Sequence, residues 1–358
     1  MLKWLLLACL SLAAHAQSPA KVLKVQSTWT PGQTAQDHLR VLGERIEKLT
    51  SGAVKIEAMT AGQLVPAFEV LDATNKKVLD GYHAISYYWI ARSPTMALFA
   101  GPPGGPFGMD HMDFLGWLYV GGGLEMWRDF YQKDMKLDII VWPAMAASPQ
   151  ALGWFRRELK SVKDFKGMKC RQTGLNAEIY SRLGQTVVNL PGSEIVAAAQ
   201  RGAIECAEWI GGVEDLRLGL PGVFKYYYAP GVHESNSIGE FGLHLDVWRA
   251  LNAQQQEAVN SAVKDTFITW LTRWQKQNAD ATDEMIRKRG VLMRRTPADI
   301  LQASLKAWDQ IAAENAAKDP TFKKVYDSQR EYAAKVVPAK RHLSPPNAFI
   351  ANHYWPPL

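Results

Sequence analysis

The chain has 358 residues, of which 47% are hydrophobic and 21% are charged, and this excludes a collagen-like or wholly disordered protein. The length is enough for about two domains, each with a core of its own. The net charge is only +6, with basic residues spread along the chain, which argues against a dedicated nucleic-acid-binding protein and fits a weak attraction of anionic solutes.

Residues 1–16 have the pattern of a secretory signal peptide. A basic start that includes Lys3 precedes an apolar run over residues 4–13, and Ala14-His15-Ala16 forms a small-x-small cleavage site. The apolar run is too short to span a membrane, and no later stretch reaches about 18 apolar residues. We therefore expect export, and the short leader indicates the periplasm of a Gram-negative bacterium.

The first part of the mature chain alternates strands with helices. Residues 22–26 and 54–58 alternate apolar and polar side chains, as half-buried strands do. Between them, Thr34 is the expected N-cap of a helix whose leucines and isoleucine fall on one face. A helix over residues 66–79 and a strand over residues 82–88 follow. This βαβαβ order is typical of a parallel sheet.

A second run of the same kind follows a Pro- and Gly-rich break at residues 101–108 and helices near residues 114–135. The apolar residues 151–155 predict a strand. The remaining predicted elements are the strand 169–173, the helix 176–183, the strand 186–190, the helix 193–200 and the strand 204–209. Two such blocks on one chain predict two α/β lobes, with an apolar pocket between them.

A long helix is expected after the second block. Asn252 and Gln255 form a capping box, and neither Pro nor Gly occurs from there to Arg289. About 38 helical residues would span roughly 57 Å, which is longer than one lobe. The helix therefore either crosses both lobes or breaks near residues 277–282. The Pro-rich end, residues 338–358, is expected to be irregular.

Only Cys170 and Cys206 remain once the leader is removed, and no zinc-type spacing is present. Two buried thiols are the favoured interpretation. The alternative is that the two sulfurs form a disulfide in an oxidising compartment.

Polar side chains stand where open α/β sheets bind ligands, outside the carboxyl ends of the strands. Arg171 and Glu208 lie near the ends of two predicted strands, and Gln150 directly precedes a third. An Arg can hold a carboxylate through two parallel hydrogen bonds, and Glu and Gln oxygens suit a hard cation such as Na⁺ or Ca²⁺. The alternative is that Arg171 and Glu208 simply pair with each other.

Aromatic residues flank these positions. Tyr88 ends a predicted first-lobe strand, Trp209 follows Glu208, and Trp29 comes after the first strand. Each ring can face a ligand or pack in the core, and core packing is the commoner role of such side chains.

Enzyme signatures do not support catalysis. The chain has no GxSxG elbow, Walker loop or kinase motif set, and the three glycines at residues 121–123 do not follow a strand in a GxGxxG frame. We therefore expect no catalytic residue and no catalytic cofactor. A periplasmic α/β hydrolase or lyase that uses Glu208 as a base is the alternative from another class.

Several motifs between residues 150 and 234 are specific. They are GWFR at residues 153–156 after Gln150, LKSVKDFKGMKCR at 159–171, Leu183-Gly184, NLPGSE at 189–194, QRGAIECAEWIG at 200–211, the tyrosines at 226–228, and His233-Glu234. With the leader and the long helix, they make the chain resemble the periplasmic solute-binding subunits of TRAP transporters, a DctP-like family. The resemblance covers essentially the whole mature chain and is greatest to the subgroup that binds 2-oxo acids and related hydroxy acids.

This resemblance implies a role for each candidate residue. Arg171 matches the arginine that clamps the solute carboxylate, and Tyr88 matches an aromatic wall. Gln150 and Glu208 match side chains that coordinate a cation bound with the solute, and Trp209 matches a position that contributes its backbone carbonyl. The implied cation is Na⁺, with Ca²⁺ as the alternative.

The function implied by the resemblance is that of a periplasmic receptor. It would bind a small monocarboxylate, a 2-oxo or 2-hydroxy acid, and deliver it to the membrane permease subunits of a TRAP transporter for uptake. Another anionic or polyol solute is the alternative ligand. Related receptors can form a homodimer through their C-terminal helices, so Trp270, Trp274 and Trp308 either form such a surface or pack within one chain.

The resemblance also implies the architecture. We expect the α/β class and a two-lobed periplasmic binding protein, with a mainly parallel sheet flanked by helices in each lobe and a long C-terminal helix bridging the lobes. The expected boundaries are residues 17–143 with part of 231–275 for the first lobe, residues 144–230 with part of 276–320 for the second lobe, and residues 321–358 for a C-terminal helix and tail.

Overall fold

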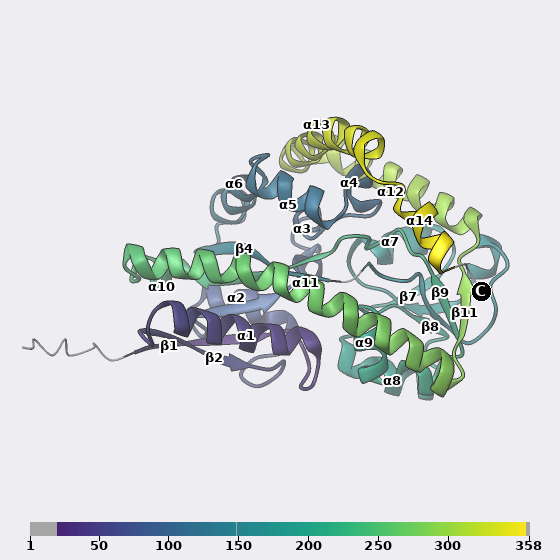
Figure 1. Cartoon of the computed structure of the whole chain (residues 1–358), viewed down its shortest axis with the longest axis horizontal. Helices are drawn as coiled ribbons and strands as arrows, with labels where there is room; N and C mark the ends of the chain where they lie inside the picture. The colour runs from purple at the N-terminus through teal and green to yellow at the C-terminus, as the bar shows by residue number, and fades with distance from the viewer. Residues whose placement is uncertain (1–19, 148, 356–358) are drawn as a thin grey trace, which may run out of the picture.

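Two separate sheets, each flanked by helices, organise the chain (Figure 1). This computed structural model describes residues 20–147 and 149–355. The two sheets confirm the expected two-lobed α/β architecture. The expected signal peptide, residues 1–16, lies outside the described residues.

The first sheet has the strand order β2-β1-β3-β10-β4. Its strands are β1 (Lys21–Ser27), β2 (Val54–Met59), β3 (Gly81–Ala84), β4 (Ile139–Ala146) and β10 (Ile238–His244). β1 pairs in parallel with β2 and β3, whereas β10 runs antiparallel to β3 and β4. A Cβ atom on Gly81 would lie 2.6 Å from the carbonyl oxygen of Gly242, so glycine permits the close approach of β3 and β10.

The second sheet has the strand order β11-β9-β5-β8-β6-β7. Its strands are β5 (Gly153–Phe155), β6 (Lys169–Arg171), β7 (Thr186–Val188), β8 (Cys206–Ala207), β9 (Tyr226–Ala229) and β11 (Leu292–Arg295). β6 is parallel to β7 and β8, and β9 is parallel to β11, whereas β5 is antiparallel to β8 and β9. Both sheets are therefore mixed, because β5 and β10 enter directly from the other lobe and run against their neighbours.

Helices cover both sheets (Figure 1). They are α1 (Thr34–Leu49), α2 (Val70–Asn75), α3 (Met96–Phe99), α4 (Gly105–Gly108), α5 (His111–Tyr119), α6 (Gly123–Asp129), α7 (Gly174–Arg182), α8 (Gly192–Gln200), α9 (Gly212–Leu218), α10 (Leu245–Arg249), α11 (Ala253–Arg289), α12 (Ala298–Lys318), α13 (Pro320–Leu343) and α14 (Asn347–Tyr354). In the described part of the chain, no helix combines the length and apolar character needed to span a membrane.

α11 crosses both lobes. Its 37 residues correspond to about 55 Å, and it contacts α1 and β4 of the first lobe and α9 of the second (Figure 1). The capping box of Asn252 and Gln255 is confirmed, and the helix passes through residues 277–282 without a break. The first of the two alternatives for this helix is therefore correct.

The tryptophans considered for a dimer surface are core residues. Trp270, Trp274 and Trp308 are all buried within this chain. Their apolar area holds α11 and α12 on the lobes, so the alternative in which these rings pack within one chain is the correct one.

Three local expectations are wrong. β3 ends at Ala84, because the Ser86 hydroxyl donates to the carbonyl oxygen of Met96 (2.8 Å) and residues 86–89 turn into a 3-10 helix. The helix expected over residues 66–79 is shorter, since Lys77 adopts the left-handed conformation just after α2. Thr34 is the first residue of α1 rather than its N-cap, and no side chain of the preceding residue caps the helix.

The expected irregular tail is also wrong for most of its length. α13 continues through Pro338 to Leu343, and α14 follows after three residues. Proline removes one helical hydrogen bond, but this part of α13 is largely solvent-accessible, where water can satisfy the freed carbonyl. The structure describes this tail only as far as Trp355.

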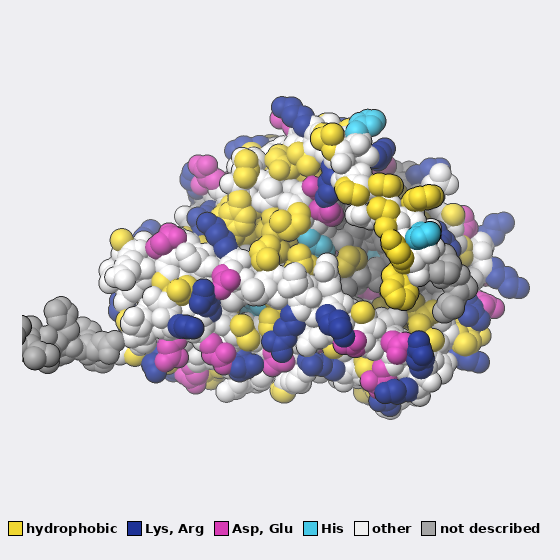
Figure 2. All heavy atoms as spheres, viewed as in Figure 1, with side chains coloured by type: hydrophobic (Ala, Val, Ile, Leu, Met, Phe, Trp, Pro, Cys, Tyr) yellow, Lys and Arg dark blue, Asp and Glu magenta, His cyan; other side chains and the backbone are white. Residues whose placement is uncertain are grey.

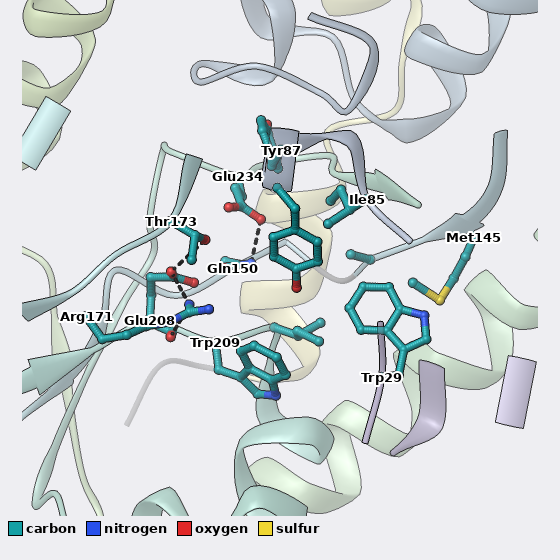
Figure 3. Close-up of a pocket in the computed structure, with 13 residues that line it drawn as sticks. Trp29, Ile85, Tyr87, Met145, Gln150, Arg171, Thr173, Glu208, Trp209 and Glu234 are labelled. Carbon is teal, nitrogen blue, oxygen red and sulfur yellow. Dashed lines mark hydrogen bonds and ion pairs between the residues drawn. The ribbon is translucent and has the colours of Figure 1, made fainter. Parts of the chain in front are cut away.

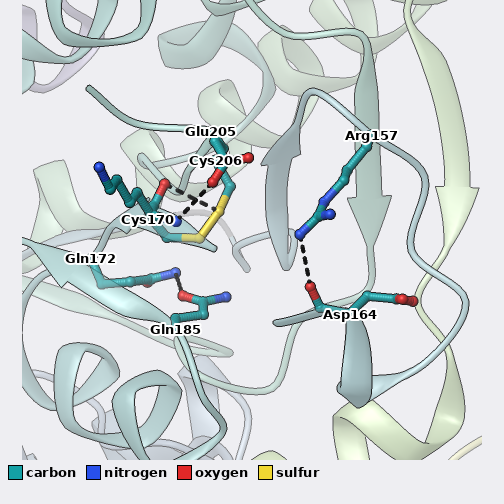
Figure 4. Close-up of a disulfide and its surroundings, with 8 residues drawn as sticks. Arg157, Asp164, Cys170, Gln172, Gln185, Glu205 and Cys206 are labelled. Carbon is teal, nitrogen blue, oxygen red and sulfur yellow. Dashed lines mark hydrogen bonds between the residues drawn. A yellow bond between two sulfur atoms is a disulfide. The ribbon is translucent and has the colours of Figure 1, made fainter. Parts of the chain in front are cut away.

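Cys170 and Cys206 form a disulfide (Figure 4). They are direct partners in the parallel pairing of β6 with β8, and their Cα atoms are 4.6 Å apart. The favoured interpretation of two free thiols is therefore wrong. A separation of 36 residues along the chain gives no sign that the two side chains meet, because only the strand register brings them together.

Candidate functional site

A cavity lies between the lobes, at the ends of strands from both sheets (Figure 3). The first lobe contributes Trp29, Ile85, Tyr87, Tyr88, Met145 and Ala147, the second lobe contributes Arg171, Thr173, Glu208, Trp209 and Ile210, and the links between the lobes contribute Gln150 and Glu234. The cavity is small. Its volume is about 30 Å³.

Arg171 lies at the end of β6 and is almost fully buried. Its Nε donates to the carbonyl oxygen of Leu190 (3.0 Å), and its Nη1 donates to the carbonyl oxygen (3.0 Å) and the carboxylate of Glu208. Its Nη2 makes no hydrogen bond to the described residues. The guanidinium is thus fixed on one side by the second lobe and can offer its remaining donors to an anion in the cavity.

Glu208 follows β8 and pairs with Arg171. The Thr173 hydroxyl donates to the same carboxylate oxygen at 3.3 Å. Burial raises the pKa of Glu208, while the Arg171 guanidinium opposes that rise. The alternative in which Arg171 and Glu208 pair is therefore realised in this structure. A carboxylate has about four lone-pair sites, so the pair does not use up the ligating capacity of Glu208.

Gln150 lies in the link between β4 and β5, with its side chain buried. Its Nε2 donates to Oε2 of Glu234 at 2.6 Å (Figure 3). Its Oε1 is buried without a hydrogen-bond partner in the described part of the chain. A buried carbonyl oxygen left unpaired costs free energy, and a cation in the cavity is a partner of the right chemistry.

Glu234 lies in the link between β9 and β10 and is also buried. Its carboxylate accepts hydrogen bonds from Gln150, from Asn176 (2.7 Å) and from the Ser237 hydroxyl (3.0 Å). Burial, and after it the nearby Glu208 carboxylate, raise the pKa of Glu234 to about 8. The cavity therefore holds two carboxyl groups and one guanidinium, a set that a bound cation would balance when a carboxylate solute enters.

The first lobe forms an aromatic wall opposite Arg171. Trp29 is held by a hydrogen bond from its Nε1 to Nδ1 of His83 (2.7 Å), and its ring lies 6.3 Å from that of Tyr88. Burial lowers the pKa of His83 to about 3, so the imidazole is neutral and its Nδ1 can accept. This wall can enclose the apolar end of a small solute.

Trp209 lines the cavity on the side of the second lobe. The Arg171 guanidinium carbon lies 5.1 Å from the centre of its ring, a cation–π arrangement. Gly192, in the NLPGSE motif, allows α8 to pack against this ring, because a Cβ atom there would lie 2.4 Å from Cη2 of Trp209. The motif thus supports the site without reaching the cavity.

All five candidate residues, Arg171, Gln150, Glu208, Trp209 and Tyr88, line this one cavity. Reasoning from strand ends missed Thr173 and Glu234. Thr173 lies two residues after the end of β6, so the rule that ligands bind outside the carboxyl ends of strands could also have predicted it. Glu234 belongs to a link that returns from one lobe to the other, and no strand or helix period marks such a position.

The chain matches a known family over most of its length. The family described as bacterial extracellular solute-binding protein, family 7 (DctP), matches residues 25–319. The chain is 35% identical over 295 residues to the "monocarboxylate 2-oxoacid-binding periplasmic protein" of Nostoc sp.. This match covers 82% of this chain and 79% of the Nostoc protein.

Two solved structures are similar to this one. A TRAP transporter solute-binding protein from Bordetella bronchiseptica, a dimer with copurified calcium and picolinate in the active site, has a TM-score of 0.86 at 26% identity, covering 94% of this chain and 98% of that chain. A TRAP periplasmic solute-binding protein from Pseudoalteromonas atlantica, with bound sodium and pyruvate, has a TM-score of 0.85 at 26% identity, covering 92% and 98%.

These matches confirm the resemblance stated from the motifs, and they concern receptors rather than enzymes. The chain belongs to the DctP family of bacterial extracellular solute-binding proteins, which are the solute receptors of TRAP transporters.

Proposed function

We propose that this protein is a periplasmic receptor for a small monocarboxylate of the 2-oxo or 2-hydroxy acid class. The observation that carries the proposal is the arrangement around Arg171, whose buried guanidinium faces a small cavity opposite an apolar wall. Arg171 binds the carboxylate of the solute, and Trp29 and Tyr88 enclose its short carbon chain. The small volume favours a solute of few heavy atoms over a sugar or a long polyol.

A cation binds with the solute in this proposal. Gln150 Oε1, the Glu208 carboxylate and the Trp209 backbone carbonyl are its ligands, and all three are the hard oxygen ligands that Na⁺ and Ca²⁺ prefer. The unpartnered Gln150 Oε1 supports this set. The cation supplies positive charge that offsets the repulsion between Glu208 and an incoming carboxylate. Na⁺ is the proposed ion and Ca²⁺ the alternative, and similar structures hold sodium or calcium.

The solute is bound and released unchanged, then passed to the membrane permease subunits of a TRAP transporter. Family membership supports this. Glu208, the one side chain considered as a catalytic base, is paired with Arg171, which also supports it. Export to the periplasm rests on the leader pattern of residues 1–16 and on the location named for the Nostoc relative.

The test is native mass spectrometry of the protein as purified, followed by a thermal-shift screen. The panel contains small 2-oxo acids, 2-hydroxy acids, dicarboxylates and polyols, each with Na⁺ and with Ca²⁺. A retained monocarboxylate and a rise in Tm confined to the first two classes support the proposal. A rise in Tm with a polyol or dicarboxylate alone, or a product formed from a 2-oxo acid, contradicts it.

We also propose that two copies pair through α14 rather than through the buried tryptophans. α14 and the residue after it expose Phe349, Tyr354 and Trp355, each by more than 60%, and apolar side chains line this segment in Figure 2. The Bordetella relative is a dimer. Sedimentation equilibrium of the protein and of a Trp355→Ser/Phe349→Ser variant tests the pairing, since only the unmodified protein should dimerise. A monomer in both samples contradicts it.

A further inference from the structure

The two short links between the lobes are joined beside the cavity. The Gln150 backbone N–H donates to the carbonyl oxygen of Glu234 (3.0 Å), and the Gly231 N–H donates to the carbonyl oxygen of Gln150 (3.2 Å). Glycine is needed at residue 231, because a Cβ atom there would lie 2.8 Å from that oxygen. The backbone therefore fixes where Gln150 and Glu234 stand relative to each other before either side chain acts.

The side chain of Glu234 then sets the orientation of the Gln150 amide group. Three donors converge on Glu234, from Asn176 on one oxygen and from Gln150 and Ser237 on the other. Figure 3 marks the bond from Gln150. The Gln150 amide donates to Glu234 through Nε2, so its NH₂ group faces that carboxyl group. Its Oε1 is then left on the other side of the amide, buried and without a described partner.

We infer that Glu234 is a positioning residue that holds the Gln150 amide with Oε1 available to the cavity, and thereby sets the affinity of the site for its cation. This inference rests on the proposed function. Without Glu234 the amide would be free to reverse and present NH₂ donors, which repel a cation. Hydrogen-bond partners of metal ligands commonly change metal affinity about 10–100-fold when removed.

The hydrogen bond between Gln150 and Glu234 also connects the cation site with both links between the lobes. Gln150 leads from β4 into β5, and Glu234 leads from β9 back to β10, so each residue stands between the two sheets. A cation held through Gln150 is thus held at the joint of the two links rather than on one lobe alone.

The experiment measures pyruvate binding by calorimetry at a series of NaCl concentrations, with choline chloride keeping the ionic strength constant. The variants are Glu234→Gln, which is isosteric, and Glu234→Asp, which keeps the charge but withdraws the acceptor from Gln150. Glu240→Gln is the matched control, since Glu240 is an equally buried carboxylate held by Tyr82 and Tyr131 away from the cavity.

Both Glu234 variants should raise the Na⁺ concentration for half-maximal pyruvate affinity about tenfold or more, with the affinity restored at high Na⁺. Glu240→Gln should leave it unchanged. In a Gln150→Met background, Glu234→Gln should add less than a twofold effect, because Glu234 acts through the Gln150 amide.

Two results would overturn the inference alone: normal Na⁺ dependence in a folded Glu234→Asp variant, or a full Glu234→Gln effect that persists with Gln150→Met. The second result would mean that Glu234 acts by its charge. If pyruvate binding by the unmodified protein depends on neither Na⁺ nor Ca²⁺, the cation part of the proposed function fails and takes the inference with it. Circular dichroism of each variant establishes that it is folded.

Discussion

Glu214 in the second lobe accepts a hydrogen bond from the backbone nitrogen of Thr34, the first residue of α1 in the first lobe, at 2.7 Å. A carboxylate from α9 thus takes the place of the missing N-cap of α1 and meets the positive end of that helix. Arg217 of α9 adds hydrogen bonds to the carbonyl oxygen of Gly32 (3.0 Å) and the Thr34 hydroxyl (2.8 Å). These contacts hold the lobes together beside the cavity.

Glu214→Ala should therefore weaken solute binding by favouring the open arrangement of the lobes. The loss of an N-cap costs about 1 kcal/mol, which corresponds to roughly a fivefold rise in Kd. Calorimetry measures the Kd, and small-angle X-ray scattering of the ligand-free protein should report a larger radius of gyration. Glu257→Ala, at a glutamate on α11 whose carboxylate accepts a hydrogen bond from the Ser261 hydroxyl, is the control. Equal affinities for both variants would mean that Glu214 does not hold the lobes closed.

Arg171→Ala should abolish tight carboxylate binding without unfolding the protein. Each charge-assisted hydrogen bond from the guanidinium contributes about 1.5–3 kcal/mol, so the loss of a bidentate pair should raise Kd at least about a hundredfold. Arg171→Lys should also bind weakly, because a point charge cannot reproduce the fork. Arg182→Ala removes a surface arginine that pairs with Glu178 and Glu314 and should bind normally. Near-normal calorimetric affinity in folded Arg171→Ala would remove Arg171 from the site.

The buried carboxyl group of Glu240 should make the free energy of unfolding depend on pH. It is buried between Tyr82 and Tyr131, and burial raises its pKa from the ordinary value of 4.5 to about 7. A carboxyl group whose pKa is higher in the folded than in the unfolded state does not destabilise the fold at a pH below its unfolded-state pKa. It destabilises the fold increasingly as the pH rises from there to its folded-state pKa. Glu240→Gln should therefore gain stability over the unmodified protein from pH 4.5 to 8, by at most about 3 kcal/mol. Urea unfolding that gives a constant difference across this range would contradict the prediction.

The disulfide should stabilise the second lobe and the site it adjoins. Closing a loop of this length is worth roughly 4 kcal/mol in the chain-entropy description. The Cys170→Ala/Cys206→Ala variant should melt at a lower temperature and bind solute more weakly, because Arg171 directly follows Cys170 and Glu208 lies two residues after Cys206. Thiol titration of the denatured mature protein should find no free thiol. Two free thiols in protein purified from the periplasm would contradict the disulfide.

Local chemistry explains which parts of the fold and site could be predicted. The alternation of strands and helices placed Arg171 and Glu208 at strand ends, and the parallel strands then brought them to one edge of a sheet. The capping box at Asn252 and the absence of Pro and Gly were enough to predict α11. These features depend on neighbours along the chain.

Other features depend on partners that are distant in sequence. The cap of α1 comes from Glu214, some 180 residues away, so Thr34 was assigned the wrong role. Glu234 reaches the cavity on a link between lobes that has no periodic pattern. The Cys170–Cys206 pair follows from strand register alone. In each case the decisive contact joins residues far apart in sequence, either across the two lobes or between strands of one sheet.

The measurement that tests the central claim most directly is calorimetric titration of the ligand-free protein with pyruvate in metal-stripped buffer. The only cation at first is choline, and NaCl or CaCl₂ is then restored at the same ionic strength. If Arg171, Glu208 and Gln150 bind a carboxylate together with a hard cation, pyruvate should bind weakly in choline and at least tenfold more tightly with Na⁺ or Ca²⁺. The same affinity in all three buffers would contradict the account, and so would a Glu208→Gln variant that keeps the full cation effect.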